Sequence, residues 1–113
     1  MKKGFYFIVT GDHDKDGNYY NKPTLSEGSF ENYGRLFIHR IAESRWNPKG
    51  WKVSHVESGA CLCADNTLKE ARRKARGLKD FSIFKLKTID ELKDAINHNP
   101  DYAEEIEQIQ LLR

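Results

Sequence analysis

The sequence predicts an α+β fold: an antiparallel sheet of about four strands packed by one amphipathic helix, with two further C-terminal helices. Three observations predict it. Short aromatic and β-branched runs recur in the first 65 residues, a helix signal begins at Thr67, and a second begins at Thr88. At 113 residues, 38% of them hydrophobic, the chain has the length and apolar content of a single domain, 1–113.

Five segments have the composition of β-strands. Residues 4–9 are aromatic and β-branched, and 36–41 are again apolar. Residues 51–56 alternate in polarity, and after a Ser-Gly turn residues 60–64 return as an antiparallel partner. Residues 81–86 follow the first helix and predict a buried strand.

Two stretches between these segments predict loops that project from the sheet. Residues 11–34 are rich in Asp, Gly and Asn, then contain Pro and Ser without a clear period. Residues 42–50 include the turn signal Asn-Pro-Lys-Gly. Loops of this length are often functional.

The helices are predicted from their N-terminal signals. Thr67 with Glu70, and Thr88 with Glu91, fit the capping box, in which both side chains satisfy free amides of the first turn. Pro100 suits the first turn of a third helix, where its missing N–H costs nothing. The apolar residues expected to face the core are Leu68, Ala71, Ala75 and Leu78, then Ile89, Leu92 and Ile96, then Tyr102, Ile106 and Ile109.

Two features indicate a cytoplasmic protein. Cys61 and Cys63 are one residue apart, so a disulfide between them would be strained and a reducing compartment is expected. No apolar run approaches the roughly 20 residues that span a bilayer, so no membrane contact is expected.

Charge is segregated along the chain. The formal net charge is +2, but residues 66–87 carry eight Lys and Arg against two acidic residues, and 88–113 carry two against seven. In the first helix Lys69, Arg72, Arg73 and Arg76 fall at i, i+3, i+4 and i+7 and so line one face. This face could follow a phosphate backbone. It could equally be a solvated surface, or be neutralised by the C-terminal acidic residues, among them Glu104, Glu105 and Glu107.

Metal sites have weaker signals. Asp12, Asp14 and Asp16, followed by Gly17, reproduce the opening of a calcium loop, but Pro23 stands where the closing Glu should be. A polar turn is the alternative interpretation. A zinc site would need the side chains His39, His55, Cys61 and Cys63 to converge, and their spacing does not match the usual zinc patterns.

Enzymatic motifs are not evident. The sequence contains no glycine-rich phosphate loop, no G-x-S-x-G elbow and no H-E-x-x-H. Ser54, His55, Glu57 and Ser58 are neighbours in sequence, but adjacency does not place a base on a nucleophile. The sequence therefore favours a binding protein without catalytic activity.

The segment from Trp51 to Leu78 supports a resemblance. Its predicted hairpin, followed by the helix Thr-Leu-Lys-Glu-Ala-Arg-Arg-Lys-Ala, resembles the closing β-β-α of double-stranded-RNA-binding domains and of the DNA-binding domains of phage and transposon integrases. The resemblance implies phosphate contacts by Lys69, Arg72 and Arg73. The whole chain also resembles the small accessory proteins that phages and mobile elements encode.

We therefore expect a phage-type accessory protein that binds a host protein or a protein–nucleic-acid complex, and inhibits a defence or nucleic-acid-processing protein. The exposed aromatic candidates Tyr19, Tyr20 and Trp46, together with the basic and acidic segments, are the expected contacts. Direct nucleic-acid binding through Lys69, Arg72, Arg73 and Arg76, with Arg40, Lys52 and Trp46 as further contacts, is the first alternative. A small metal-binding module, with Ca²⁺ as the candidate ion, is the second.

Overall fold

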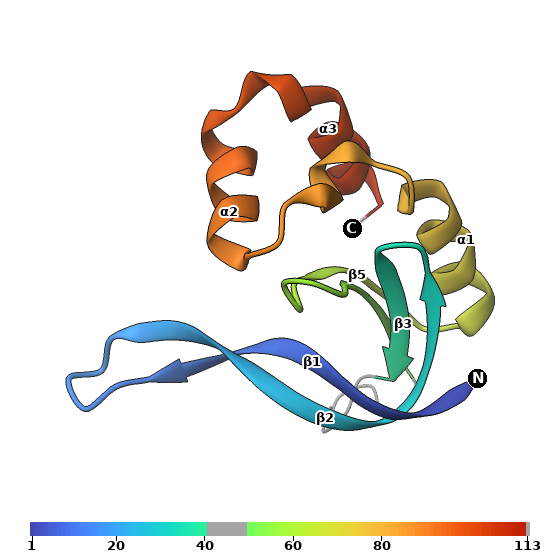
Figure 1. The fold of residues 1–113 in the computed structure, drawn as a ribbon, viewed down its shortest axis with the longest axis horizontal. Coiled ribbons are helices and arrows are strands. Elements are labelled where there is room, and N and C mark those ends of the chain that lie inside the picture. The colour runs from blue at the N-terminus through green and yellow to red at the C-terminus, as the bar shows by residue number, and fades with distance from the viewer. Residues whose placement is uncertain (41–49, 113) are drawn as a thin grey trace.

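A computed structural model describes residues 1–40 and 50–112. Within these residues the protein has five antiparallel strands, which neighbour one another in chain order, β1 to β5. The first helix, α1, covers one face of β3, β4 and β5 (Figure 1). The long hairpin β1–β2, called the ribbon below, crosses the opposite face of these strands. The α+β prediction is confirmed, with one strand more in the sheet than expected.

The ribbon replaces most of the loop expected at 11–34, and that prediction is wrong. β1 (Lys2–His13) pairs along its whole length with residues 19–30 of β2 (Tyr19–Tyr33). Only residues 14–18 turn: the Asp14 carboxylate accepts hydrogen bonds from the amides of Asp16 and Asn18, both at 2.9 Å. Gly17 supplies the positive φ of 84° that closes the turn.

Pro23 shows how β2 accommodates a residue that is typical of loops. It lies opposite Val9, whose amide points away from β2 and donates to the Gly59 carbonyl at 3.0 Å. The pair Val9–Pro23 is therefore one of the non-hydrogen-bonded pairs of an antiparallel ladder, in which neither residue donates to the other. A proline at such a position removes no ladder bond, so the strand tolerates it.

The central strands follow the sequence closely. β3 (Leu36–Arg40), β4 (Trp51–His55) and β5 (Cys61–Asp65) match the predicted segments within a residue, although Ile41 and most of the 42–50 loop lie outside the described residues. The turn between β4 and β5 rests on β1 at Gly59, which has a φ of 74°. A Cβ atom there would come within 3.0 Å of the Ile8 backbone, so this contact requires glycine.

Helix α1 (Leu68–Leu78) provides the main cover of the sheet. The Thr67 hydroxyl accepts from the Glu70 amide at 3.3 Å, which is one half of the predicted capping box, while the Glu70 carboxylate pairs with Arg73 instead. Ala71, Ala75 and Leu78 are buried and join one core cluster with apolar residues of β3, β4 and β5. The predicted helix and its apolar stripe are confirmed.

The expected strand at 81–86 is wrong. A short 3₁₀ helix, η1 (Ser82–Lys85), occupies this segment and buries Ile83 and Phe84. The Glu105 carboxylate accepts from the amides of Ser82 (2.8 Å) and Ile83 (2.9 Å), and so satisfies the amides that begin η1. An apolar run alone does not distinguish a buried strand from a buried turn of helix.

The C-terminal part contains the other two predicted helices. Thr88 caps α2 (Ile89–His98), and its hydroxyl accepts from the Glu91 amide at 3.1 Å. A 3₁₀ turn, η2 (Pro100–Tyr102), leads into α3 (Ala103–Leu111). Ile96, expected to face the core, is exposed instead, because Leu92 and Ala95 form the buried side of α2. None of the helices in the described ranges is long and apolar enough to cross a bilayer.

Candidate partner-binding surface

The predicted basic face of α1 is half neutralised within the protein. Arg72 makes a two-pronged contact with Glu31 on β2, with Nη2 to Oε2 at 2.9 Å and Nε to Oε1 at 3.1 Å. This pairing lowers the pKa of the Glu31 carboxyl. Arg73 pairs with Glu70 of its own helix at 2.9 Å. Both guanidinium groups are therefore engaged before any partner arrives.

The two remaining cations of this face are more available. Arg76 lies 5.9 Å from the centre of the Tyr33 ring. In the described part of the chain, neither Arg76 nor Lys69 has a carboxylate partner. A phosphate would meet two available cations here rather than the expected four, which weakens the case for a nucleic-acid surface.

In the described part of the chain, the acidic C-terminal residues make no ion pair with the basic helix. Glu105 caps η1, while Glu104 and Glu107 are exposed on α3. No ion pair joins α3 to α1 among the residues that the structure describes. The carboxylates that pair with α1 are Glu31, Glu70 and Asp65, the last of which binds Lys74.

The predicted aromatic contacts lie elsewhere again. Tyr19 and Tyr20 are exposed at the far end of the ribbon, and the Tyr19 ring contacts His13 edge-on at 5.6 Å. Trp46 lies outside the described residues. The described contacts predicted for a protein partner thus lie on three separate elements, α1, α3 and the ribbon end, and do not form one site.

The candidate metal ligands have other bonds. Asp12 pairs with Lys22 at 2.9 Å, which lowers the pKa of the Asp12 carboxyl, and Asp14 accepts from backbone amides of its turn. His39 and Cys61 line a pocket between the ribbon and the strands β3, β4 and β5. Cys63 instead packs in the core on the α1 side. Among the described residues, no group of three or more His, Cys, Asp or Glu side chains is placed to hold a metal ion.

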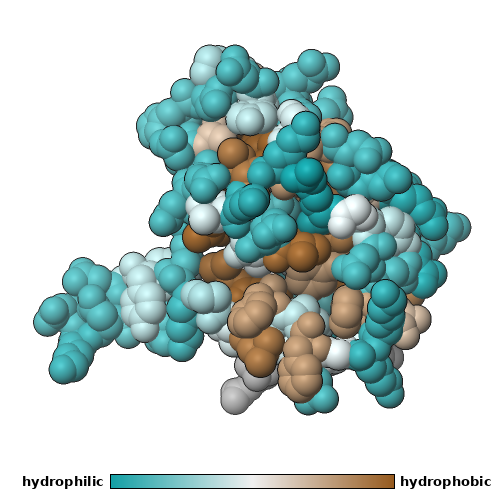
Figure 2. Space-filling view, in the orientation of Figure 1, coloured by the Kyte–Doolittle hydropathy of each residue, from teal (hydrophilic) through white to brown (hydrophobic). Residues whose placement is uncertain are grey.

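A surface that sequence reasoning missed lies on the outer face of the ribbon. Phe5, Phe7 and Leu25 are 64%, 57% and 54% exposed. Phe7 and Leu25 are directly opposite in the ladder, and Phe5 lies two residues from Phe7 on the same face. We call these three side chains the outer patch. Figure 2 shows apolar side chains gathered over the crossing part of the ribbon and in the hollow between it and the helices.

The backbone beside the outer patch is also available. Because the Val9 amide points away from β2, the alternate residues Lys3, Phe5 and Phe7 also direct their N–H and C=O groups outward. Within the described residues, Val9 is the only member of this series with a backbone partner on that side, the Gly59 carbonyl. As far as the described residues go, the edge of β1 from Lys3 to Phe7 is therefore an open strand edge.

An apolar groove continues from the ribbon toward α2. It has a volume of about 440 Å³ and lies between the ribbon, β5 and the C-terminal helices. Val9 and Tyr19 line it on the ribbon side, and Leu92 and Ile96 on the α2 side, with Lys93 the one charged residue of its lining. The outer patch and this groove both expose apolar side chains.

The signal for the outer patch was present in the sequence. Residues 4–9 are apolar at both odd and even positions, so a strand there has two apolar faces. The inner face is covered, since the Tyr6 ring lies 5.4 Å from Phe37 and 4.9 Å from His39. The other face has no cover in the described part of the chain, which leaves Phe5 and Phe7 exposed.

No protein-family model, no curated protein and no solved structure matches this chain.

Proposed function

We propose that this chain is a binding protein that captures a partner protein on the outer face of its ribbon. The observation that carries the proposal is the outer patch: three large apolar side chains, each more than half exposed, two on the edge strand β1 and one directly across from it on β2. Exposed apolar groups scattered singly are ordinary, but a contiguous group marks an interaction site.

The strand edge supports a specific mode of capture. An extended segment of the partner would add to β1, with its main chain hydrogen-bonded to Lys3, Phe5 and Phe7 and its side chains packed on the outer patch. Natural proteins usually protect such edges with charges, and Lys2 and Lys3 flank this one. The lysines limit non-specific pairing while leaving a selected partner free to bind.

We infer the class of target from the resemblance of the chain to phage and mobile-element accessory proteins. On this proposal, the partner is a host protein, or a protein–nucleic-acid complex, of a defence or nucleic-acid-processing system, and capture inhibits it. The segregated charge supports a macromolecular target, since the exposed acidic residues Glu104 and Glu107 and the cations Lys69 and Arg76 lie on different helices.

Affinity capture from a bacterial lysate tests the proposal. We expect the unaltered protein and a Leu111→Ser control to retain the same host protein with or without nuclease, and Phe7→Ser to lose it. Leu111 is a matched control, because it is 70% exposed on α3, away from the ribbon. Equal retention by Phe7→Ser would refute docking on the outer patch.

The mode of capture has its own test. Lys3→Pro removes an outward N–H but no ladder bond, so the ribbon should persist. Lys3→Ala removes the same side chain and keeps the N–H. If a partner strand pairs with β1, binding falls by roughly fivefold to tenfold in Lys3→Pro relative to Lys3→Ala, the value of one net hydrogen bond. Equal affinities of the two variants would show that the partner docks through side chains and does not pair with β1.

Direct nucleic-acid binding is the second proposal. Lys69 and Arg76 support it, because neither has a carboxylate partner in the described ranges. It predicts recovery that disappears with nuclease, and binding that weakens steeply as salt rises. Retention that is insensitive to nuclease and unchanged in a Lys69→Glu, Arg76→Glu variant would remove it.

A further inference from the structure

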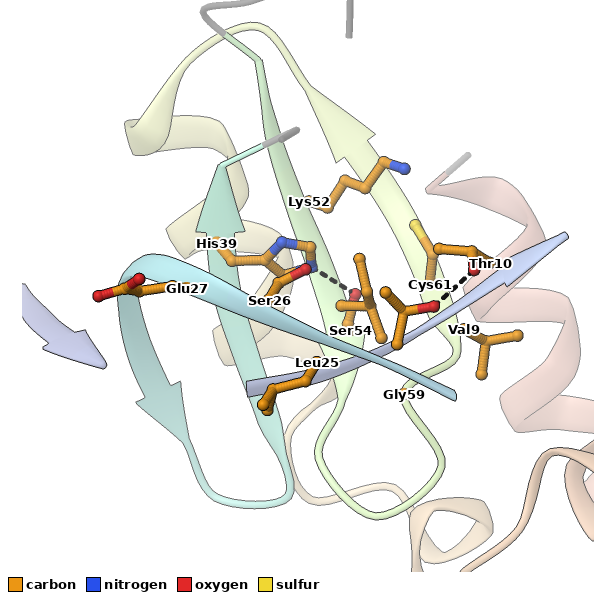
Figure 3. Close-up of a pocket in the computed structure, with 12 residues that line it drawn as sticks. Val9, Thr10, Leu25, Ser26, Glu27, His39, Lys52, Ser54, Gly59 and Cys61 are labelled. Carbon is orange, nitrogen blue, oxygen red and sulfur yellow. Dashed lines mark hydrogen bonds between the residues drawn. The ribbon is translucent and has the colours of Figure 1, made fainter. Parts of the chain in front are cut away.

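A second concave site lies on the other side of the ribbon, between its inner face and β3, β4 and β5 (Figure 3). This inner pocket has a volume of about 320 Å³, in the range of small-molecule sites. The apolar Ile8 side chain forms part of its wall. Its polar lining includes hydroxyl groups from three strands: Thr10, Thr24, Ser26 and Ser54.

The floor of the pocket has a fixed proton arrangement. His39 Nδ1 lies 2.8 Å from the Arg40 carbonyl, which can only accept, so this nitrogen carries the proton. His39 Nε2, 2.8 Å from Ser54 Oγ, is then the acceptor, and the Ser54 hydroxyl donates to it. The hydroxyl proton of Ser54 is therefore occupied in the bond to His39. What Ser54 can offer a molecule in the pocket is its lone pairs, so it selects a hydrogen-bond donor.

The walls supply donors. Thr10 Oγ1 and Thr24 Oγ1 lie 2.6 Å apart, and because one donates to the other, one hydroxyl proton of the pair is left over. The Ser26 hydroxyl has no hydrogen-bond partner within the described part of the protein. These groups suit an acceptor-rich ligand group such as a carboxylate or a phosphate.

Lys52 supplies the charge. It is half-buried at the pocket and lies directly across the ladder from His39. Lys52 has no ion pair with any described residue, whereas Lys22 and Lys74 both have carboxylate partners. Glu27, the acidic residue of the lining, points away from the other labelled side chains (Figure 3). Among the described residues, the pocket thus holds one positive charge that no carboxylate pairs with.

We propose that the inner pocket binds a small organic anion that also carries a hydroxyl group, of the hydroxy-acid or sugar-phosphate class. The anionic group lies against Lys52 and the wall hydroxyls. The ligand hydroxyl donates to Ser54, whose own proton is held by His39. The apolar wall packs against the carbon skeleton. This site is separate from the outer patch, which lies on the opposite face of the same two strands.

The test uses amide NMR spectra of the protein with three probes: ribose 5-phosphate, 3-phosphoglycerate and gluconate. Each is added to about 10 mM, which occupies most of a site with a dissociation constant near 1 mM. We expect at least one probe to shift the amide signals of His39, Lys52, Ser54 and Cys61, while neutral ribose shifts none of them. The absence of any such shift with all three probes would overturn the proposal.

Two variants separate a specific site from general attraction of anions. Lys52→Met keeps the apolar stem and removes the charge, and we expect it to weaken the binding probe roughly tenfold to a hundredfold, as loss of a charged hydrogen bond does. Lys93→Met is the matched control and should leave the affinity unchanged. Equal affinity of the Lys52→Met variant and the unaltered protein would overturn the role of Lys52, and with it the proposed site.

Discussion

The two faces of the central sheet are covered in different ways. On one face, α1 and the C-terminal helices bury a continuous core that includes Leu36, Ile38 and Phe84, each with 1% exposure or less. On the other, the ribbon covers Phe37 and His39 through Tyr6 but leaves a pocket beside them. The helix-covered face holds the fold together, and the ribbon-covered face has the space and the exposed surface that binding requires.

Each face also holds one buried histidine, and the pair sharpens this contrast. His55 connects β4 to the helical part: its Nε2 lies 2.8 Å from the Phe84 carbonyl, and its Nδ1 lies 2.8 Å from Ser58 Oγ. His39 makes the same two kinds of bond, to a carbonyl and a serine, but within the strands. The same chemistry fastens two elements on one face and forms the floor of a pocket on the other.

The largest expected difference between the faces is in stability. Phe84→Ala removes a fully buried ring and should lower the free energy of unfolding by about 3–5 kcal/mol. Phe7→Ser changes a ring that is 57% exposed and should shift it by no more than about 0.5 kcal/mol. Urea unfolding of both variants checks this. A large loss of stability in Phe7→Ser would mean that the outer patch is structural.

The next effect is a dependence of stability on pH. Burial lowers the pKa of His39 to about 4, from an ordinary value of 6.5, and it lowers the pKa of His55 as well. Between about pH 4 and pH 6.5, the unfolded chain binds a proton at position 39 that the folded protein does not. The free energy of unfolding should therefore fall as the pH drops from 6.5 to 4, by up to about 3 kcal/mol for His39 alone.

Urea unfolding at several pH values, with two variants, assigns this effect. His39→Gln should show a weaker pH dependence than the unaltered protein. His98→Gln, at an exposed position at the end of α2, should keep the full dependence. The same slope in His39→Gln and in the unaltered protein would show that His39 is not responsible.

A smaller difference in stability is expected between alanine variants of the two serines that bond these histidines, Ser54 and Ser58. Ser54→Ala leaves the buried His39 Nε2 without a donor and should cost about 1–3 kcal/mol. Ser58 is only half-buried, so water can replace its hydroxyl, and Ser58→Ala should cost about 1 kcal/mol or less. Thermal unfolding of the two variants decides the order. A reversed order would mean that water already reaches His39 from the pocket.

Local signals in the sequence predicted the helix-covered face well. Thr67 and Thr88 cap their helices as expected, and the Ala71–Ala75–Leu78 stripe faces the core. These features depend on residues three or four apart, which the sequence shows directly. The strand prediction at 81–86 is wrong because the apolar run reflects the burial of Ile83 and Phe84 in the core cluster, which a 3₁₀ helix provides as well as a strand.

The ribbon-covered face depends on contacts that no local pattern shows. The Pro and Ser content of residues 11–34 predicted a loop, and only the register, which places Pro23 opposite Val9, shows how a strand accommodates the proline. The His39–Ser54 bond joins residues 15 positions apart, and the pairing of Arg72 with Glu31 joins residues 41 apart. Composition predicted that Phe5 and Phe7 lie in a strand, but only the arrangement of the ribbon over the sheet decides which face remains exposed.

The central claim is that the outer face of the ribbon holds the partner. Site-specific photocrosslinking tests it directly, with a photoreactive phenylalanine analogue placed at Phe7 in one variant and at Leu111 in another, each used in a bacterial lysate treated with nuclease. We expect one crosslinked host protein from position 7 and none from position 111. Crosslinks to that protein from position 111 but not from position 7 would contradict the claim.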